Sequence, residues 1–386
     1  MTDSAPDILN VLVITPLGRG GQGGIDRLMD EVRIALEDKP ELNVRPRFSA
    51  SRGSGSLVWA PFYLTKSIVA LVGSRATKSV DLVHLNLAHN GSAIRKMIIA
   101  AIARRLGVPY VVHLHGSEFR QFWDSAPVWL DRPLKRFFLN AAQVIVLGKI
   151  WAEFVLQKVP DVAKHIAVVP NASRAAPEMG AALKGDNGTL QILFLGKLGA
   201  RKGTPDLISA LAHLPRLPAW RAVLAGNGDV EVSRERVKKL ELDDRVSIPG
   251  WMNDLEVSDL LACSDILVLP SFNENLPMSV IEGCAYGLAI VATPVGATEE
   301  VIKPGFSGLL VTPGDVSELT KAISRLLSDT ELRMTLGRNA RELHTKTFEI
   351  GAYTKRLTEI WWIASGKERP PHISPFVKSP PESAAR

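Results

Sequence analysis

The chain has 386 residues, of which 46% are hydrophobic and 22% charged, a composition that is ordinary for globular proteins and excludes a largely disordered chain. This length predicts two domains of roughly 150 residues or more. The formal net charge is +6, and no uninterrupted apolar run approaches the roughly 18–20 residues that span a bilayer. The chain has two cysteines, Cys263 and Cys284, and a single disulfide bond between them would be too little to stabilise a chain of this length. This favours a reduced, cytoplasmic compartment.

The first half of the sequence alternates short apolar, β-branched runs with helical patterns, as parallel sheets covered by helices do. Residues 8–15 predict a buried strand, and residues 25–37 predict the helix that follows it. Further strands are predicted at 43–48, 82–86, 110–114, 144–147 and 166–169, and further helices at 91–106 and 150–159. The pattern predicts a first doubly wound domain over residues 1–171.

Residues 172–189 are rich in Ala, Gly, Pro and Asn and have no clean period, which predicts a linker. The alternation then restarts and predicts a second doubly wound domain over residues 190–348. Its strands are predicted at 191–195, 222–225, 245–248, 266–269, 289–292 and 309–311, and its helices at 204–213, 230–240, 254–263, 277–286 and 316–327. Helical pattern continues from 331 to 364, and residues 365–386 predict a disordered tail.

The predicted fold class is therefore α/β, with two Rossmann-like, doubly wound domains. Ligands of such sheets bind beyond the carboxyl ends of the strands. With two domains, the cleft between them is the expected site.

The positive charge is concentrated in the first half of the chain. Residues 1–171 carry a net charge of +7, and residues 43–112 hold ten basic side chains and one acid. Trp59, Phe62 and Tyr63 lie in the same stretch. A basic surface with aromatic anchors suits an anionic membrane face. A nucleic-acid partner and a merely solvated face remain open on charge alone.

A glycine loop follows the first predicted strand. Residues 18–23 satisfy G-x-G-x-x-G, and Arg47 and Arg52 are suited to a 2′-phosphate, so an NADP-dependent oxidoreductase is one alternative. The long turn and the missing acid after the second strand count against it. The other functional interpretation is that the amides of Gly23 and Gly24 approach a phosphate or sugar across the cleft.

The second domain carries a more specific constellation. Residues 196–203 place three cations on a loop that leads into a helix, which indicates a diphosphate site. Farther along, Glu274 precedes a helix predicted to begin at Pro277, and Glu282 lies on its second turn. The start of this helix can bind an anion, and the carboxylates on either side of it can bind hydroxyls. Together they fit a ligand in which hydroxyl groups flank a diphosphate. A nucleotide sugar has that layout.

With these residues in view, the chain resembles retaining glycosyltransferases of the GT-B fold, in the GT4 family. The resemblance covers about residues 8–363. It is carried by the pair Glu274/Glu282, the 196–203 loop, residues 291–296 with Glu299 and Glu300, residues 169–171, residues 224–228 and Gly23-Gly24.

The resemblance implies roles for individual residues. Glu274 would hold hydroxyls of the donor sugar, aided by the amides of Asn275 and Leu276, and His115, at the end of a strand, would face that sugar. These two are the predicted catalytic residues, Glu274 and His115.

The remaining predicted site residues would bind the rest of the donor. Glu282 would bind the ribose, Lys202 the diphosphate with Lys197 beside it, and Met252 would lie near the base. Two features depart from the family pattern. Lys197 stands where Arg is more common, and residues 274–277 read Glu-Asn-Leu-Pro where Glu-Gly-Phe-Gly is frequent.

The implied activity is retaining transfer of a sugar from a nucleoside-diphosphate sugar to an acceptor hydroxyl. The positive groups make a divalent metal unnecessary, and no cofactor is expected. The basic first domain suggests that the acceptor is a glycan or lipid-linked glycan of exopolysaccharide or envelope polysaccharide biosynthesis. The enzyme is expected to be peripheral, on the inner face of the cell membrane. No nucleic-acid partner is expected. The helix at 349–364 would cross back to the first domain, as in the family. The alternatives are the NADP-dependent oxidoreductase and a non-enzymatic basic membrane- or nucleic-acid-binding protein.

Overall fold

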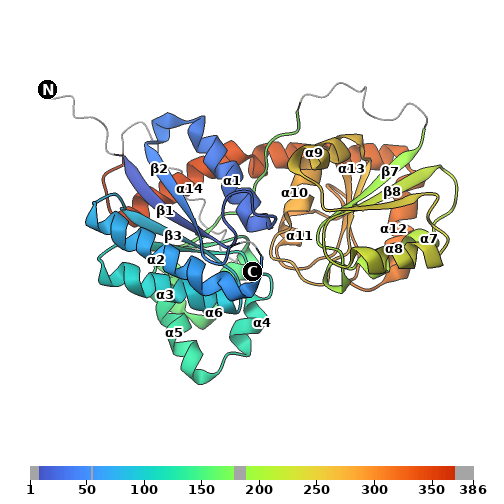
Figure 1. Cartoon of the computed structure of the whole chain (residues 1–386). Coiled ribbons are helices and arrows are strands. Elements are labelled where there is room, and N and C mark those ends of the chain that lie inside the picture. Colours follow the sequence, from blue (N-terminus) through green and yellow to red (C-terminus); the bar gives the residue numbers. More distant parts are fainter. Residues whose placement is uncertain (1–7, 54, 178–187, 370–386) are drawn as a thin grey trace, which may run out of the picture.

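The computed structural model describes residues 8–53, 55–177 and 188–369, and contains two six-stranded parallel sheets side by side (Figure 1). The first sheet has the order β2-β1-β3-β4-β5-β6 and the second β12-β11-β10-β7-β8-β9. The strands of the first sheet are β1 (Leu9–Thr15), β2 (Val44–Ala50), β3 (Leu82–Leu87), β4 (Tyr110–Leu114), β5 (Gln143–Val146) and β6 (Ile166–Val168). Those of the second are β7 (Leu190–Leu195), β8 (Trp220–Ala225), β9 (Val246–Gly250), β10 (Ile266–Leu269), β11 (Ala289–Ala292) and β12 (Leu309–Leu310). The α/β fold with two Rossmann-like halves is confirmed.

Helices cover both faces of the first sheet. Alternate residues of β1 divide between two cores: Val11 and Val13 pack with α1 (Gly24–Glu37) and α14 (Ile350–Ser365), and Leu12 and Ile14 pack on the opposite face. That second core includes residues of α2 (Ala60–Ala76), α3 (Gly91–Arg105), α5 (Val128–Leu139) and α6 (Lys149–Lys158). Every residue of β3 and β4 is buried, as expected for strands covered on both sides.

The second sheet is enclosed in the same way. Its helices are α7 (Thr204–Ala212), α8 (Val230–Lys239), α9 (Asp254–Cys263), α10 (Met278–Ala285), α11 (Thr298–Val301), α12 (Val316–Ser328) and α13 (Thr330–Leu343). After α13 the chain returns to the first sheet, where α14 packs against α1, β3 and β4 (Figure 1). The return that the family resemblance implied is therefore present.

Three helices of the first half were not predicted. Helix α2 has no clear amphipathic period, because apolar residues such as Val69 and Val72 lie on its exposed side. Helix α5 contains Pro133, which masks a helical pattern. The third is the short helix α4 (Phe119–Asp124). Four 3₁₀ turns and one π-helical turn complete the described elements: η1 (Pro40–Leu42), η2 (Leu57–Trp59), η3 (Pro160–Lys164) and η5 (Ala200–Lys202) are 3₁₀, and η6 (His344–Phe348) is the π turn.

The segment Leu57–Ala76 is long and apolar on average, although Lys66 and Arg75 interrupt its apolar run. It forms 20 helical residues, and an 18-residue stretch of it has a mean hydropathy of 1.4 and is 22% buried. By length and composition alone, it is the one helix of the described residues that could cross a membrane. Residues 178–187 of the predicted linker and 370–386 of the predicted tail lie outside the described residues.

Candidate active site

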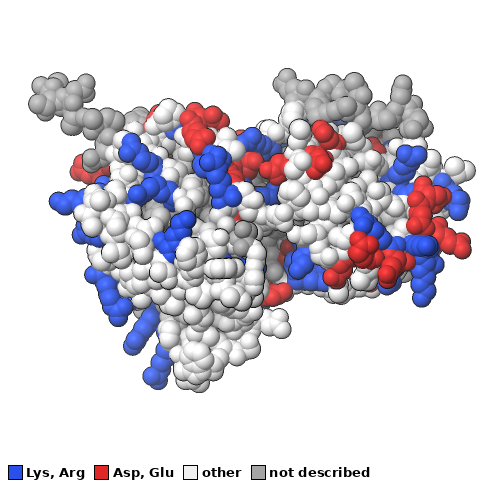
Figure 2. Space-filling model, viewed as in Figure 1, with Lys and Arg blue, Asp and Glu red and all other residues white. Residues whose placement is uncertain are grey.

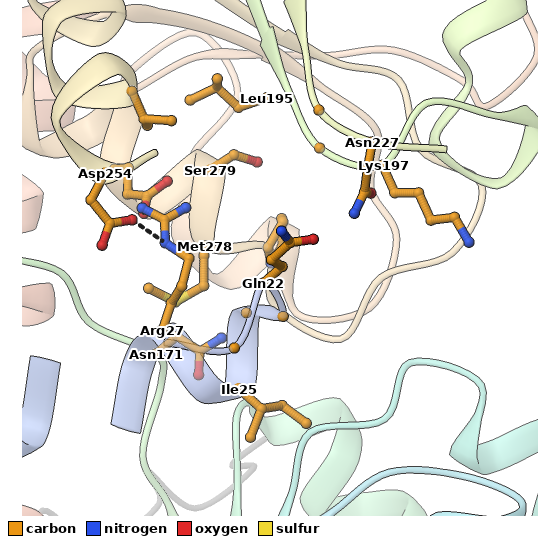
Figure 3. A pocket seen from close by; sticks show the side chains of 18 of the residues that line it. Gln22, Ile25, Arg27, Asn171, Leu195, Lys197, Asn227, Asp254, Met278 and Ser279 are labelled. Carbon is orange, nitrogen blue, oxygen red and sulfur yellow. Dashed lines mark ion pairs between the residues drawn. The ribbon is translucent and has the colours of Figure 1, made fainter. Parts of the chain in front are cut away.

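One cavity of about 680 Å³ lies between the two sheets, and residues of both halves line it (Figure 3). All ten residues predicted from the sequence are among its lining: Gly23, Gly24, His115, Lys197, Lys202, Met252, Glu274, Asn275, Leu276 and Glu282. They come from the ends of β1, β4, β7, β9 and β10 or from the helix starts beyond them. The structure therefore brings the whole predicted set together.

Glu274 lies in the loop between β10 and α10 and is only 8% exposed. Its Oε1 accepts a hydrogen bond of 2.8 Å from the Ser271 hydroxyl and forms an ion pair with Lys202. Arg201 adds a second cation at 3.9 Å from the same oxygen. The loop that carries both cations turns at Gly203, where φ is +67° and a Cβ would lie 2.0 Å from the Pro270 carbonyl oxygen. Glycine is required there because the cation loop and the glutamate loop touch.

Helix α10 begins one residue later than predicted. Pro277 is its N-cap with extended backbone, and its carbonyl accepts from the amides of Val280 and Ile281. The amides of Met278 and Ser279, at the first turn, have no acceptor within the helix and are available to an anion. Glu282, on the second turn, is 8% exposed. The predicted layout of two carboxylates around a helix start is present.

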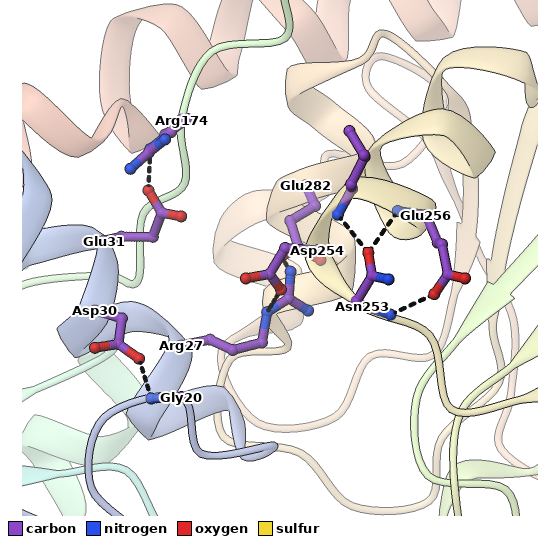
Figure 4. A network of polar contacts seen from close by, with 10 residues as sticks. Gly20, Arg27, Asp30, Glu31, Arg174, Asn253, Asp254, Glu256 and Glu282 are labelled. Carbon is purple, nitrogen blue, oxygen red and sulfur yellow. Dashed lines mark hydrogen bonds and ion pairs between the residues drawn. The ribbon is translucent and has the colours of Figure 1, made fainter.

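An arginine of the first half reaches across the cleft to Glu282. The Nη2 atom of Arg27, on α1, lies 2.9 Å from Glu282 Oε1, and its Nε lies 3.4 Å from Asp254 Oδ1 (Figure 4). Close by, a Cβ on Gly24 would lie 3.5 Å from Met278 Cγ, so the glycine loop faces the start of α10. Sequence analysis missed Arg27, because nothing in its local pattern indicates which element it faces.

Two amides also join the halves at the cleft. The Asn275 side chain donates to the Leu114 carbonyl at 3.2 Å, and the Asn171 side chain donates to the Leu276 carbonyl at 2.7 Å. Behind this loop, a Cβ on Gly296 would lie 2.1 Å from the Glu274 carbonyl oxygen at a φ of +60°. Gly296 therefore permits residues 291–296 to support the loop that carries Glu274.

His115 is fixed by a chain of buried groups. Asn86 donates from Nδ2 to the Ile14 carbonyl at 3.2 Å, so its Oδ1 accepts from His115 Nε2 at 2.9 Å. His115 thus carries its proton on Nε2 and has Nδ1 left as an acceptor. Burial, with the charges of His84 and Lys96, lowers the pKa of His115 to about 3. His115 is neutral at physiological pH and is suited to accept a hydrogen bond from a hydroxyl.

The histidine chain extends to the returning helix. Trp361, on α14, donates from Nε1 to His84 Nδ1 at 2.9 Å, and His84 Nε2 lies 3.3 Å from His113 Nδ1. Because an indole only donates, the proton of His84 lies on Nε2 and is donated to His113. The His113 ring lies 3.9 Å from that of His115, centroid to centroid. Helix α14 thereby contributes to the position of His115.

Two parts of the basic stretch differ from the prediction of a basic surface. Lys96 is completely buried, so the surface has fewer charges than the sequence count. Arg47, one of the residues on which the oxidoreductase alternative rested, donates to the Ser74 hydroxyl at 2.5 Å and the Ser79 carbonyl at 2.7 Å. Arg47 therefore ties β2 to the end of α2 instead of facing the glycine loop.

Comparisons with known proteins agree with this arrangement. Residues 9–172 match the family model "Glycosyl transferase 4-like domain", and residues 178–343 match "Glycosyl transferases group 1". An alpha-D-kanosaminyltransferase of Streptomyces kanamyceticus is 27% identical over 329 residues, 80% of this chain and 81% of that protein. A UDP-Gal:alpha-D-GlcNAc-diphosphoundecaprenol alpha-1,3-galactosyltransferase of Escherichia coli is 23% identical over 313 residues, 77% of this chain and 79% of that protein.

Solved structures share the fold over almost the whole length. Sucrose-phosphate synthase from Thermosynechococcus elongatus has a TM-score of 0.73 at 19% identity and covers 92% of this chain and 98% of its own. The Anabaena protein HepE, in complex with UDP and glucose, has a TM-score of 0.71 at 20% identity and covers 91% of this chain and 98% of its own. Since the two family models together span both sheets and the cleft between them, the chain belongs to the group 1 glycosyltransferases of the GT-B fold.

Proposed function

We propose that the chain is a retaining glycosyltransferase of the GT4 family that moves a sugar from a nucleoside-diphosphate sugar to an acceptor hydroxyl. The observation that carries this proposal is the convergence of ten residues, chosen for donor chemistry, on one cavity. The proposed donor lies with its ribose at Glu282, its diphosphate at Lys202 and Lys197, its base near Met252 and its sugar near Glu274. His115 faces the sugar from the opposite sheet.

In this proposal, the enzyme lowers the barrier by positioning the reactants and by stabilising the departing diphosphate. Lys197, Lys202 and the amides of Met278 and Ser279 supply the positive groups. The departing phosphate accepts the proton of the acceptor hydroxyl, and the acceptor oxygen replaces it on the same face of the sugar. Neither a divalent metal nor another cofactor is part of the proposed reaction.

The proposed acceptor is a lipid-linked glycan of exopolysaccharide or cell-envelope polysaccharide biosynthesis. The Escherichia coli relative acts, by its name, on a sugar linked to diphosphoundecaprenol. The first half of this chain exposes large apolar side chains at η2 and the start of α2, among them Val58 at 80%, Trp59 at 60% and Phe62 at 59%. In Figure 2, Lys and Arg cover the left side and the lower part of this half, and Asp and Glu gather mainly at its upper edge. Apolar and cationic groups together favour an anionic membrane surface.

We further propose that α2 lies along that surface and does not cross the membrane. Ser67, on its inner side, donates to the Ala50 carbonyl at 2.9 Å, and Ser74 accepts from Arg47. Leu71 is completely buried in the core of the first sheet. Withdrawal of the helix into a bilayer would break these contacts. The proposed location is therefore the inner face of the cell membrane, with the enzyme attached peripherally from the cytoplasm.

A ligand screen tests the donor class. UDP, ADP, GDP, several of their sugars and NADPH are added separately, and the melting temperature is measured. One nucleoside diphosphate and the corresponding sugar nucleotide should raise the melting temperature of the protein. Incubation of that sugar nucleotide with membrane lipid extracts should then give a glycosylated product whose anomeric configuration equals that of the donor. Stabilisation by NADPH alone would support the oxidoreductase instead, and an inverted product would contradict the proposed retention.

A further inference from the structure

Two arginines of the first half lie close together without an acidic partner. Arg52 is the second residue after β2, and Arg95 lies on the second turn of α3. Both are half-buried, and the Nε atom of each is buried without a hydrogen-bond partner among the described residues. No described carboxylate lies within ion-pair distance of either guanidinium, and Arg52 Nη2 makes one long contact, 3.5 Å, to the Gly55 carbonyl. Burial and the charge of Arg52 both lower the pKa of Arg95, so the two charges repel each other.

A third basic residue, Lys96, links the two segments that carry the arginines. Lys96 is completely buried, and its Nζ donates to the Ser51 hydroxyl at 2.6 Å and to the Ser92 hydroxyl at 3.4 Å. Ser51 immediately precedes Arg52, and Ser92 lies one turn before Arg95. Burial, together with the charge of Arg95, lowers the pKa of Lys96 to about 7, while Asp26 opposes the shift. Asp26 acts on Lys96 but not on the two arginines, so the repulsion between Arg52 and Arg95 would be relieved by an anion that joins them.

The position of these cations relates them to the cleft. The Arg52 backbone amide donates to the Pro16 carbonyl at 2.9 Å. Leu17, which follows Pro16 in the chain, lines the cavity. The charge of Lys96 contributes to the lowered pKa of His115. Arg52 and Arg95 are not themselves among the cavity-lining residues. They therefore lie beside the reaction centre, at the carboxyl edge of the first sheet, and outside the donor residues.

Apolar groups adjoin the arginines on their other side. A Cβ on Gly53 would lie 2.0 Å from the ring of Tyr63, so the segment that carries Arg52 packs against the first turns of α2. The neighbouring residues Leu57, Val58, Trp59 and Phe62 are exposed. A ligand bound here meets cations toward the cleft and apolar side chains away from it.

We propose that Arg52 and Arg95, positioned by Lys96, bind the phosphate of a lipid phosphate or diphosphate acceptor, whose apolar chain lies along Leu57–Phe62. This inference rests on the proposed function and names the site that holds its acceptor. Guanidinium groups bind phosphate oxygens through paired hydrogen bonds, which a single lysine cannot reproduce. The glycan beyond the phosphate then extends toward His115 and the donor sugar.

The first experiment measures binding of the full chain to neutral phosphatidylcholine vesicles with and without undecaprenyl diphosphate. Arg52→Gln and Arg95→Gln should each weaken binding to the diphosphate-containing vesicles about tenfold, since a charge-assisted hydrogen bond is lost. Arg105→Gln removes the same charge from the exposed far end of α3 and is the matched control. It should change binding less than about twofold. Equal losses in all three variants would overturn the site, because they would indicate general charge attraction.

Two further measurements keep the test decisive. Lys96→Met should raise the melting temperature, because a buried charge is removed, and still weaken binding to the diphosphate vesicles. Unchanged binding in this variant would contradict the positioning role. Soluble pyrophosphate should compete only weakly, and competition as strong as that of the lipid would overturn the apolar part of the site.

Donor binding separates this inference from the proposed function. The affinity for the nucleoside diphosphate found in the ligand screen should be the same in the wild type, Arg52→Gln and Arg95→Gln. A wild type that binds no nucleoside diphosphate would contradict the proposed function itself. A wild type that binds it, together with arginine variants that bind the diphosphate vesicles normally, would contradict only the acceptor site.

Discussion

The two glutamates of the cleft have similar burial but different surroundings. Glu274 faces Lys202 and Ser271, whereas Glu282 faces Arg27 from the opposite half. In the proposed complex, Glu282 holds the ribose, which undergoes no chemistry, and Glu274 holds the sugar that is transferred. Interactions that are equal in ground and transition states affect KM, and those that strengthen in the transition state affect kcat.

Steady-state kinetics of Glu282→Ala and Glu274→Ala therefore distinguish these roles. Glu282→Ala should mainly raise KM for the donor, and Glu274→Ala should mainly lower kcat, each by about tenfold to a hundredfold. Calorimetry of nucleoside-diphosphate binding provides the control. Loss of nucleotide binding in Glu274→Ala with normal turnover in Glu282→Ala would mean that the roles are exchanged.

In the proposed complex, Arg27 competes with the ribose for Glu282, because its guanidinium already pairs with Oε1 of that carboxylate. Arg27→Ala should therefore raise the affinity for the nucleoside diphosphate about fivefold, which corresponds to about 1 kcal/mol for a partly exposed ion pair. Arg33→Ala is the control, because Arg33 pairs with Asp30 and Glu37 of its own helix. Weaker binding in Arg27→Ala would instead make Arg27 a donor ligand.

The cations near Glu274 predict how the enzyme responds to chelators. If Lys197, Lys202 and the α10 amides stabilise the departing diphosphate, EDTA should leave most of the activity intact. Lys202→Met should lower kcat about tenfold or more, and added Mg²⁺ should not restore it. Activity that disappears with EDTA and returns with Mg²⁺ or Mn²⁺ would show that a metal stabilises the leaving group.

At the scale of elements, β3, β4 and α14 enclose three histidines whose protonation opposes folding. Burial lowers the pKa of His84 to about 4 and that of His115 to about 3, and the pKa of His113 lies well below its usual value. In the unfolded chain, histidines bind protons below about pH 6.5. The unfolding free energy is therefore at its full value above pH 6.5 and should fall as the pH decreases toward 4.

Urea unfolding at a series of pH values measures this dependence. His113→Gln removes one such group while it keeps an acceptor for His84, and its stability should depend less steeply on pH between 6.5 and 4. His213→Gln is the control, because His213 is exposed on the second domain and its Nδ1 donates only locally, to the Ser209 carbonyl. Equal slopes in both variants would contradict the assignment to the buried histidines.

At the scale of the whole molecule, the two halves differ in the surface that they present. Most of the exposed large apolar side chains of the described residues lie on the first half. In Figure 2, Lys and Arg prevail on the left side and lower part of that half, whereas both signs of charge mix on the second. Membrane contact through the first half would leave the second free to move during donor binding. The cleft would then remain open to the cytoplasm while the acceptor enters from the membrane side.

Vesicle sedimentation tests this orientation. The protein should bind anionic vesicles, and salt should weaken the binding, because exposed charges are screened over about 10 Å at 0.1 M. The double variant Trp59→Ser/Phe62→Ser should bind about tenfold more weakly, since two apolar anchors are lost. Phe306→Ser, at an exposed aromatic of the second half, should bind as the wild type does. Equal binding to neutral and anionic vesicles would contradict the proposal.

The local pattern of the sequence determined the two parallel sheets and the residues around the cleft. A buried strand, a loop and a helix in succession place Glu274 and Glu282 at the carboxyl edge of a sheet, because that geometry follows from neighbouring residues alone. The same holds for His115 at the end of β4 and for the cation loop after β7. Helix α2 was missed because its period is obscured by exposed apolar residues.

Only the tertiary structure decided which distant groups meet. Arg27 contacts Glu282, Trp361 contacts His84 and Lys96 contacts Ser51 through pairs that lie far apart in the chain. Hydrophobic periodicity specifies which face of an element is buried, but it carries no information about which polar side chain of another element lies opposite. That depends on how the two sheets and the returning helix pack, and this packing is also what turns Lys96 from a predicted surface charge into a buried one.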